Sequence, residues 1–141
     1  MLTQVSHMNV WVHDQDEALE FYTGTLGFEV REDVTLEQFG NYRWLTVGPV
    51  SQPDVQFILS IPGPPAMDED AADELMGLIA RGAVSGAGMA IFASDDVRAT
   101  YDDLTARGVE FTQEPIERSY GIDAAFRDPS GNGFRIMQPP R

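Results

Sequence analysis

Residues 6–28 read SHMNVWVHDQDEALEFYTGTLGF, and this stretch decides the fold because its pattern returns later in the chain. Its first part alternates: Met8, Val10 and Val12 are apolar, whereas the residues between them are polar or aromatic. A period of two is typical of a strand that buries one of its faces. We therefore expect a strand over residues 7–13 with two chemically different faces.

A helix is expected to follow this strand directly. Asp14 stands three residues before Glu17, the spacing of a capping box in which each side chain binds a backbone N–H at the helix start. Gly27 can adopt the left-handed conformation that ends many helices. Between them, four apolar residues recur at helical spacing: Ala18, Leu19, Tyr22 and Leu26.

The same pattern returns at residues 88–108. GMAIFAS predicts an alternating strand, Asp96 takes the cap position and Gly108 closes the helix. Asp96 follows Asp14 by 82 positions and Gly108 follows Gly27 by 81, so the second copy is one residue shorter near its helix end. Its helix has an apolar face formed by Val97, Tyr101 and Leu104.

Aromatic and β-branched residues mark the remaining strands. These segments are residues 28–34, 41–47 and 55–61 in the first half, and residues 109–115, 123–129 and 133–139 in the second. Between the halves, a proline-rich run precedes a helical pattern that starts at Asp68 or Asp70 and ends at Gly82. This segment predicts a linker with one short helix.

The element order predicts an α+β fold of tandem βαβββ repeats. We expect one domain over residues 1–141, with modules at residues 1–61 and 86–141 and a linker at residues 62–85. Neither repeat could bury its sheet alone, so the pair is expected to form a curved mixed sheet with outer helices and an internal cleft. A ligand would bind in that cleft.

The charge balance excludes some classes of partner. Nine basic residues stand against 23 acidic ones, giving a net charge of -14, so we expect no nucleic-acid and no membrane partner. We interpret the acidity as a solubility surface; attraction of a cationic ligand is the alternative. The N-terminus lacks a basic and then apolar leader, and the longest apolar run, VQFILSI, is too short for a membrane span. A cytoplasmic protein is expected.

Two motifs resemble those of a known family. The first is H-x6-D-x3-A-L-x-F-Y-x3-LGF from His7 onward, and the second is DPSGNGF at residues 128–134. Together they resemble the vicinal oxygen chelate superfamily, which includes glyoxalase, extradiol dioxygenases and bleomycin resistance proteins. The resemblance covers essentially the whole chain and implies the tandem repeat fold and a homodimer.

The resemblance also implies a divalent metal held at four positions, of which only His7 carries a matching ligand. Gln56 offers a neutral carbonyl oxygen where a carboxylate is expected. Met89 has a thioether, a poor ligand for hard or borderline metals, and Arg135 is a permanent cation. We therefore predict no metal site and no cofactor.

Strand alternation would place the same positions around one pocket: His7, Asn9, Trp11, Gln56, Met89 and Arg135. One hypothesis is a metal-independent binding protein for a drug or metabolite, with Arg135 binding an anionic group. The alternative is a lyase, isomerase or dioxygenase-type enzyme, with His7 as general base or residual metal ligand and Arg135 stabilising an oxyanion. A purely structural role is also open, in which Arg135 pairs with an acid such as Asp128 or Glu117.

Two weaker interpretations remain. Glu117, Tyr120 and Asp123 could form a lid over the pocket, although a turn with ordinary surface polar groups is favoured. A protein-interaction module would fit the acidic surface and the proline-rich linker, but no specific motif indicates it.

Overall fold

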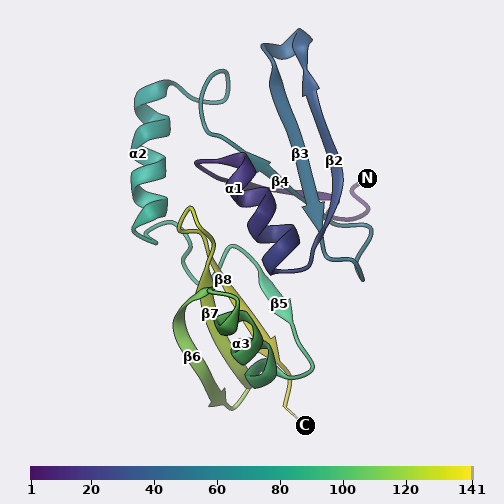
Figure 1. Ribbon diagram of the computed structural model, residues 1–141, viewed down its shortest axis with the longest axis vertical. Helices are drawn as coiled ribbons and strands as arrows, with labels where there is room; N and C mark the ends of the chain where they lie inside the picture. The colour runs from purple at the N-terminus through teal and green to yellow at the C-terminus, as the bar shows by residue number, and fades with distance from the viewer. Residues whose placement is uncertain (141) are drawn as a thin grey trace. The chain divides into compact units, whose positions relative to one another are not determined.

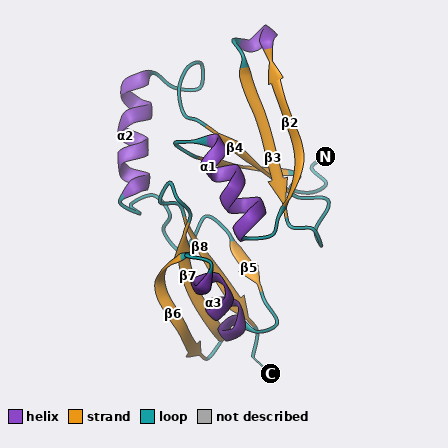
Figure 2. Ribbon diagram, viewed as in Figure 1, coloured by secondary structure: helices purple, strands orange, loops and turns teal. Residues whose placement is uncertain are grey.

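The computed structural model describes residues 1–140, and it divides the chain into two compact units, Met1–Met76 and Gly77–Arg141. Each unit has one four-stranded mixed sheet and the expected βαβββ order of elements (Figures 1 and 2). The α+β fold of tandem repeats is therefore confirmed. No helix within residues 1–140 is long and apolar enough to cross a membrane.

Unit 1 contains the stretch that opens the sequence. In chain order its elements are β1 (His7–Trp11), α1 (Gln15–Leu19), η1 (Glu20–Thr25), β2 (Glu29–Leu36), η2 (Glu37–Phe39), β3 (Tyr42–Gly48) and β4 (Gln56–Ser60). The strand order across the sheet is β1-β4-β3-β2. β1 pairs with β4 in parallel, whereas the two other pairs are antiparallel.

Unit 2 repeats this arrangement with the order β5-β8-β7-β6. Its elements are β5 (Ile91–Ala93), α3 (Val97–Ala106), β6 (Glu110–Arg118), β7 (Gly121–Arg127) and β8 (Gly133–Gln138). The remaining helix, α2 (Glu69–Ala80), is the helix expected in the linker. It begins after Asp68, whose carboxylate accepts the backbone N–H of Ala71 at 2.7 Å.

The core of unit 1 lies between its sheet and α1. Figure 1 shows α1 lying across the sheet, and Ala18 of α1 and Tyr22 of the following segment η1 are buried. The sheet contributes alternate apolar residues from three strands: Val10, Leu45, Val47, Phe57 and Leu59. This face is the apolar one predicted from the period of two.

The first repeat has one more residue between its helix cap and its glycine stop than the second, and this residue is accommodated within the helix of unit 1. α1 continues as a π-helical segment, η1, whereas α3 is α-helical from Val97 to Ala106. A π turn holds one more residue than an α turn, so the caps and glycine stops of the two repeats still correspond. Gly27 and Gly108 both have positive φ, 80° and 90°, as the C-terminal stop requires.

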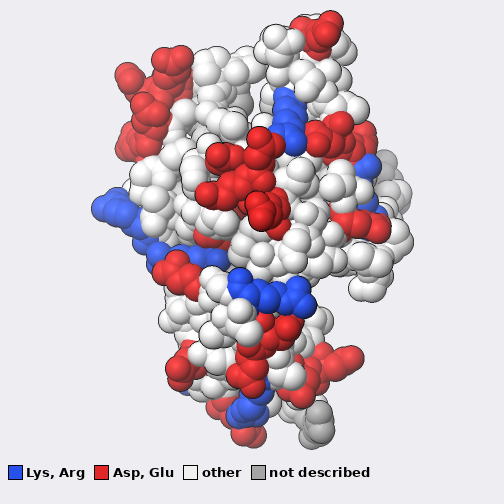
Figure 3. Space-filling view, in the orientation of Figure 1, with Lys and Arg blue, Asp and Glu red and all other residues white. Residues whose placement is uncertain are grey.

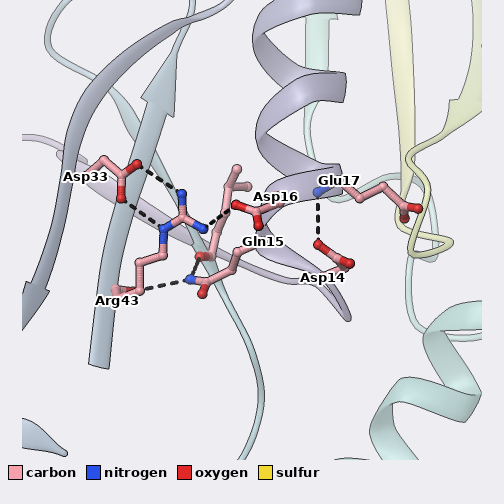
Figure 4. A network of polar contacts seen from close by, with 7 residues as sticks. Asp14, Gln15, Asp16, Glu17, Asp33 and Arg43 are labelled. Carbon is pink, nitrogen blue, oxygen red and sulfur yellow. Dashed lines mark hydrogen bonds and ion pairs between the residues drawn. The ribbon is translucent and has the colours of Figure 1, made fainter. Parts of the chain in front are cut away.

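A polar network fastens the start of α1 to the sheet (Figure 4). Asp14 caps the helix by accepting the Glu17 N–H at 2.9 Å. Arg43 of β3 donates two hydrogen bonds to Asp33, at 2.9 and 3.0 Å, and a third to Asp16 at 2.7 Å. The hydrogen bonds from Arg43 hold the pKa of Asp33 below its usual value.

Candidate ligand-binding site

One face of the unit 1 sheet carries most of the residues singled out in the sequence. The register sets His7 beside Gln56 on β4, and Asn9 and Trp11 follow at every second position of β1. Val10, between them, is buried in the core under α1, so these side chains lie on the opposite face of the sheet. We call this surface the His7 face; it consists of His7, Asn9, Trp11, Trp44, Thr46, Gln56, Ile58 and Ser60.

Aromatic rings supply much of the apolar surface of the His7 face. Trp11 and Trp44 are half-buried, so part of each indole is accessible. The rings of His7 and Trp44 lie 5.9 Å apart between centroids, tilted by 49°. Within residues 1–140, His7 Nδ1 lies 2.9 Å from Ser6 Oγ, and Nε2 has no protein partner. The imidazole therefore keeps one nitrogen for a ligand.

Two buried hydroxyls fix the amide side chains of this face. Ser60 Oγ donates to Asn9 Oδ1 at 2.6 Å, and Thr46 Oγ1 donates to Gln56 Oε1 at 2.7 Å. Thr46 and Ser60 are buried, at 0% and 2% exposure, so water does not compete for these bonds. Each amide oxygen already accepts one hydrogen bond, and this orients the NH₂ group of the same side chain as a donor for a ligand.

The donors at the predicted ligand positions do not fit a divalent metal. Gln56 Oε1, the only oxygen of that side chain, already accepts from Thr46. Arg135 carries a positive charge and lies in unit 2, and Met89 precedes β5 rather than lying within it. Over the described residues, no three His, Cys, Asp or Glu side chains are grouped to hold a metal ion. The residues present therefore do not form the metal site that the fold implies.

Arg135 is ion-paired within unit 2. Its Nη2 donates to Asp123 Oδ1 and to Gln113 Oε1, both at 2.8 Å. The Asp123 side chain is 1% exposed and also accepts from Gln113 Nε2 and from the Tyr120 hydroxyl. Burial raises the pKa of Asp123, but the hydrogen bonds from Tyr120, Arg135 and Gln113 outweigh it and hold the pKa below its usual value. The carboxylate is therefore ionised at neutral pH and neutralises Arg135.

Arg135 does pair with a neighbouring acid, as the structural alternative expected, but that acid is Asp123. Arg135 pairs with neither Asp128 nor Glu117, because Asp128 instead accepts three backbone N–H groups, at 2.9 to 3.0 Å, in the turn before β8. The expectation of ordinary surface polar groups at residues 120–123 is wrong for Asp123, which is buried. Its hydrogen bond with the Tyr120 hydroxyl raises the pKa of Tyr120.

The structure groups His7, Asn9, Trp11 and Gln56 on one face of unit 1, whereas Met89 and Arg135 belong to unit 2. A pocket built from all six residues stays a prediction. Sequence reasoning missed Trp44, Thr46 and Ser60, which join the His7 face through the β3–β4 register. The alternation of NYRWLTV carried a usable signal, since Trp44 and Thr46 share one parity.

A cavity of about 510 Å³ opens in unit 2 near the start of α3, and none of the six predicted pocket residues lines it. Its charged lining residues have both signs: Asp96, Arg98, Glu117 and Arg118. These groups lie on the protein surface and are exposed. The cavity lacks the aromatic anchors that small-molecule sites usually have, so the His7 face is the better candidate.

Comparisons with known proteins agree with this geometry. A family model described as Glyoxalase/Bleomycin resistance protein/Dioxygenase superfamily matches residues 4–136. The uncharacterized protein YurT of Bacillus subtilis (strain 168) is 36% identical over 131 residues, which covers 92% of this chain and 94% of YurT.

Two solved structures are similar over nearly their whole length. The crystal structure of UcmS2 is 44% identical, with a TM-score of 0.88, and covers 97% of this chain and 98% of its own. TnmS3, described as an antibiotic binding protein from Streptomyces sp. CB03234, is 29% identical with a TM-score of 0.75, and covers 99% of this chain and 98% of its own.

Proposed function

Because the chain belongs to the Glyoxalase/Bleomycin resistance protein/Dioxygenase superfamily, we propose that it binds a small organic molecule, a drug or metabolite, without a metal ion. The ligand lies on the His7 face, between the indoles of Trp11 and Trp44 and the amides of Asn9 and Gln56. The observation that carries the proposal is the pair of hydroxyl-to-amide bonds, which orient polar groups beside accessible aromatic rings.

The chemistry of this face favours an aromatic ligand with a few acceptor atoms. Aromatic pairs contribute about 0.5–1.5 kcal/mol beyond the area that they bury. The free NH₂ groups of Asn9 and Gln56 would bind carbonyl or ether oxygens of the ligand, and His7 Nε2 supplies one further polar contact. The similarity to TnmS3, an antibiotic binding protein, supports an antibiotic as the kind of ligand.

Catalysis is the second candidate, with His7 as a base. It is supported by the partner-free Nε2 that His7 shows within the described residues. An oxyanion role for Arg135 has less support, because Asp123 neutralises this guanidinium at a distance of 2.8 Å. Ligand binding therefore explains more of the contacts on the His7 face than catalysis does.

We further propose a cytoplasmic homodimer with no nucleic-acid or membrane partner. The net charge of -14 supports the exclusion of phosphate-rich partners. Light scattering of the purified protein should give twice the 15.6 kDa chain mass. A monomer at all concentrations tested would contradict the dimer.

Quenching of tryptophan fluorescence tests ligand binding, because both tryptophans of the chain lie on the His7 face. The protein is titrated with bleomycin and with a panel of polycyclic aromatic antibiotics. We expect saturable quenching by at least one compound and a loss of affinity of roughly tenfold in Trp44→Leu, measured by calorimetry.

The two histidines provide a matched control. His7→Ala should weaken binding, whereas His13→Ala should not, because His13 lies beyond β1 and pairs with Glu17 at 3.1 Å. Mass spectrometry of the recovered compound distinguishes binding from turnover. Equal binding by both histidine variants would refute the proposed site, and a chemically altered compound would favour the catalytic candidate.

A further inference from the structure

Unit 2 also contains a second, smaller cavity. It has a volume of about 140 Å³ and is bordered by the glycine-rich loop of residues 82–88, by β7 and by β8. Two arginines, Arg127 and Arg135, are part of its lining. Among the described residues that line it there is no Asp or Glu. A cavity lining of this composition is unusual in a chain that has 23 acidic residues.

The β7–β8 register places the two arginines on the same face of the sheet. Arg127 is paired with Gly133, and Arg135 is paired with Ala125. The arginines are therefore diagonal neighbours, with Cα atoms about 7–8 Å apart. Each faces a small residue across the strand pair, and this lack of side-chain volume leaves room for the cavity. Asp123 offsets the charge of Arg135, so Arg127 supplies the positive charge that is not ion-paired at this cavity.

The two guanidinium groups differ in their partners. Arg135 uses Nη2 for Asp123 and Gln113 and, within residues 1–140, has no partner at Nη1 or Nε. The Arg127 side chain makes no hydrogen bond or ion pair with any described residue. The Arg127 side chain is nevertheless half-buried, because its guanidinium lies against the backbone of Gly82. A Cβ added to Gly82 would lie only 2.3 Å from Arg127 Nη2. Glu110 is the cross-strand neighbour of Arg127 on β6, but no ion pair joins the two side chains within residues 1–140, so the Arg127 guanidinium is available to an anionic ligand.

The loop adds neutral donors to the same cavity. In the part of the chain that the structure describes, the backbone N–H groups of Ser85, Gly86 and Ala87 have no protein acceptor, and these residues line the cavity. Ser85 Oγ accepts the Gly133 N–H at 2.6 Å, which leaves its hydroxyl hydrogen to donate. Consecutive free backbone N–H groups in a loop with positive φ are typical of anion-binding concavities, and Gly86 has a φ of 56°.

We propose that this cavity binds one oxyanion group, a phosphate or carboxylate, between Arg127, Arg135 and the 82–88 loop. The guanidinium fork matches such oxygens, and charge-assisted bonds of this kind are roughly twice as strong as neutral ones. Whole organic ligands need cavities of about 300–1,000 Å³, so a cavity of about 140 Å³ accommodates a single anionic group. Figure 3 shows how acidic the displayed surface is around the few basic side chains. The site is independent of the proposed function of the His7 face.

Inorganic phosphate and acetate are the probes, titrated by calorimetry at constant ionic strength and neutral pH. We expect saturable binding in the millimolar range, with ¹⁵N–¹H shifts at Ser85, Gly86 and Ala87. Arg127→Gln should weaken binding by about tenfold or more, and Arg127→Lys should be intermediate because it keeps the charge but loses the fork. Removing Arg127 leaves no acid unpaired, so both variants should fold.

Arg98→Gln is the matched control, because Arg98 is exposed on α3 and the variant loses the same charge. It should bind phosphate like the wild type. The proposal is overturned if neither anion binds saturably, if Arg127→Gln and Arg98→Gln bind equally, or if the shifts lie outside the loop. Loss of antibiotic binding with phosphate binding intact would count against the proposed function alone.

Discussion

Asp123→Asn should destabilise the protein more than any change of a surface carboxylate. Asp123 is the acid that pairs with Arg135 within residues 1–140, and its side chain is 1% exposed. Asparagine keeps the size of the side chain and one acceptor oxygen. It removes the negative charge, however, and it sets an NH₂ group among the donors of Gln113, Tyr120 and Arg135.

The magnitude follows from the burial of the two partners. Breaking a fully buried ion pair costs about 3–5 kcal/mol, because the remaining charge is left without compensation. The Arg135 side chain keeps 25% exposure, so water can solvate part of its charge and the cost falls to about 2–3 kcal/mol. With an m-value of about 2 kcal/mol/M, the urea midpoint should drop by roughly 1–1.5 M.

Urea denaturation at two pH values tests the electrostatic origin of this cost. The pKa of Asp123 is lowered in the folded state, so its contribution is present above the unfolded pKa of about 4 and is lost as pH falls through the folded value. The difference between wild type and Asp123→Asn should therefore be full at pH 7 and shrink in acid. Asp95→Asn, an exposed control, should change stability by less than about 0.5 kcal/mol.

The reasoning would be refuted by a difference below about 0.5 kcal/mol at pH 7, or by one of the same size at low pH. The first result would mean that Asp123 does not hold Arg135. The second would mean that shape rather than charge sets the cost.

Two further changes test other parts of the fold. Arg43→Met should lower the free energy of unfolding by about 1 kcal/mol, because it removes the ion pairs with Asp33 and Asp16. These pairs are partly exposed to water, which limits their strength. An unchanged urea midpoint would contradict this prediction. Gly131→Ala should lower the free energy of unfolding by about 2 kcal/mol or more, because the φ of Gly131 is +105° and the added Cβ would lie 2.3 Å from the Ile79 carbonyl oxygen. Thermal unfolding measures this loss. Gly77→Ala is the control, because a Cβ at Gly77 would meet open space.

The sequence by itself determined the local structure of both repeats. Asp14 and Asp96 were identified as helix caps and Gly27 and Gly108 as stops, and each does what was expected. Such signals depend on a side chain and its own backbone a few residues away, so they can be recognised without knowing the rest of the fold. The same holds for the alternation that separates Val10 from its neighbours on the His7 face.

Only the tertiary structure decided what the predicted site residues contact. Arg135 was expected to bind an anion or to pair with Asp128 or Glu117, but its partner is Asp123, a diagonal neighbour across the β7–β8 pair. Trp44 joins the His7 face through the register of β3 with β4. Such contacts depend on which strands are adjacent and on their register, and a shift of one residue would turn every side chain of a strand to the other face.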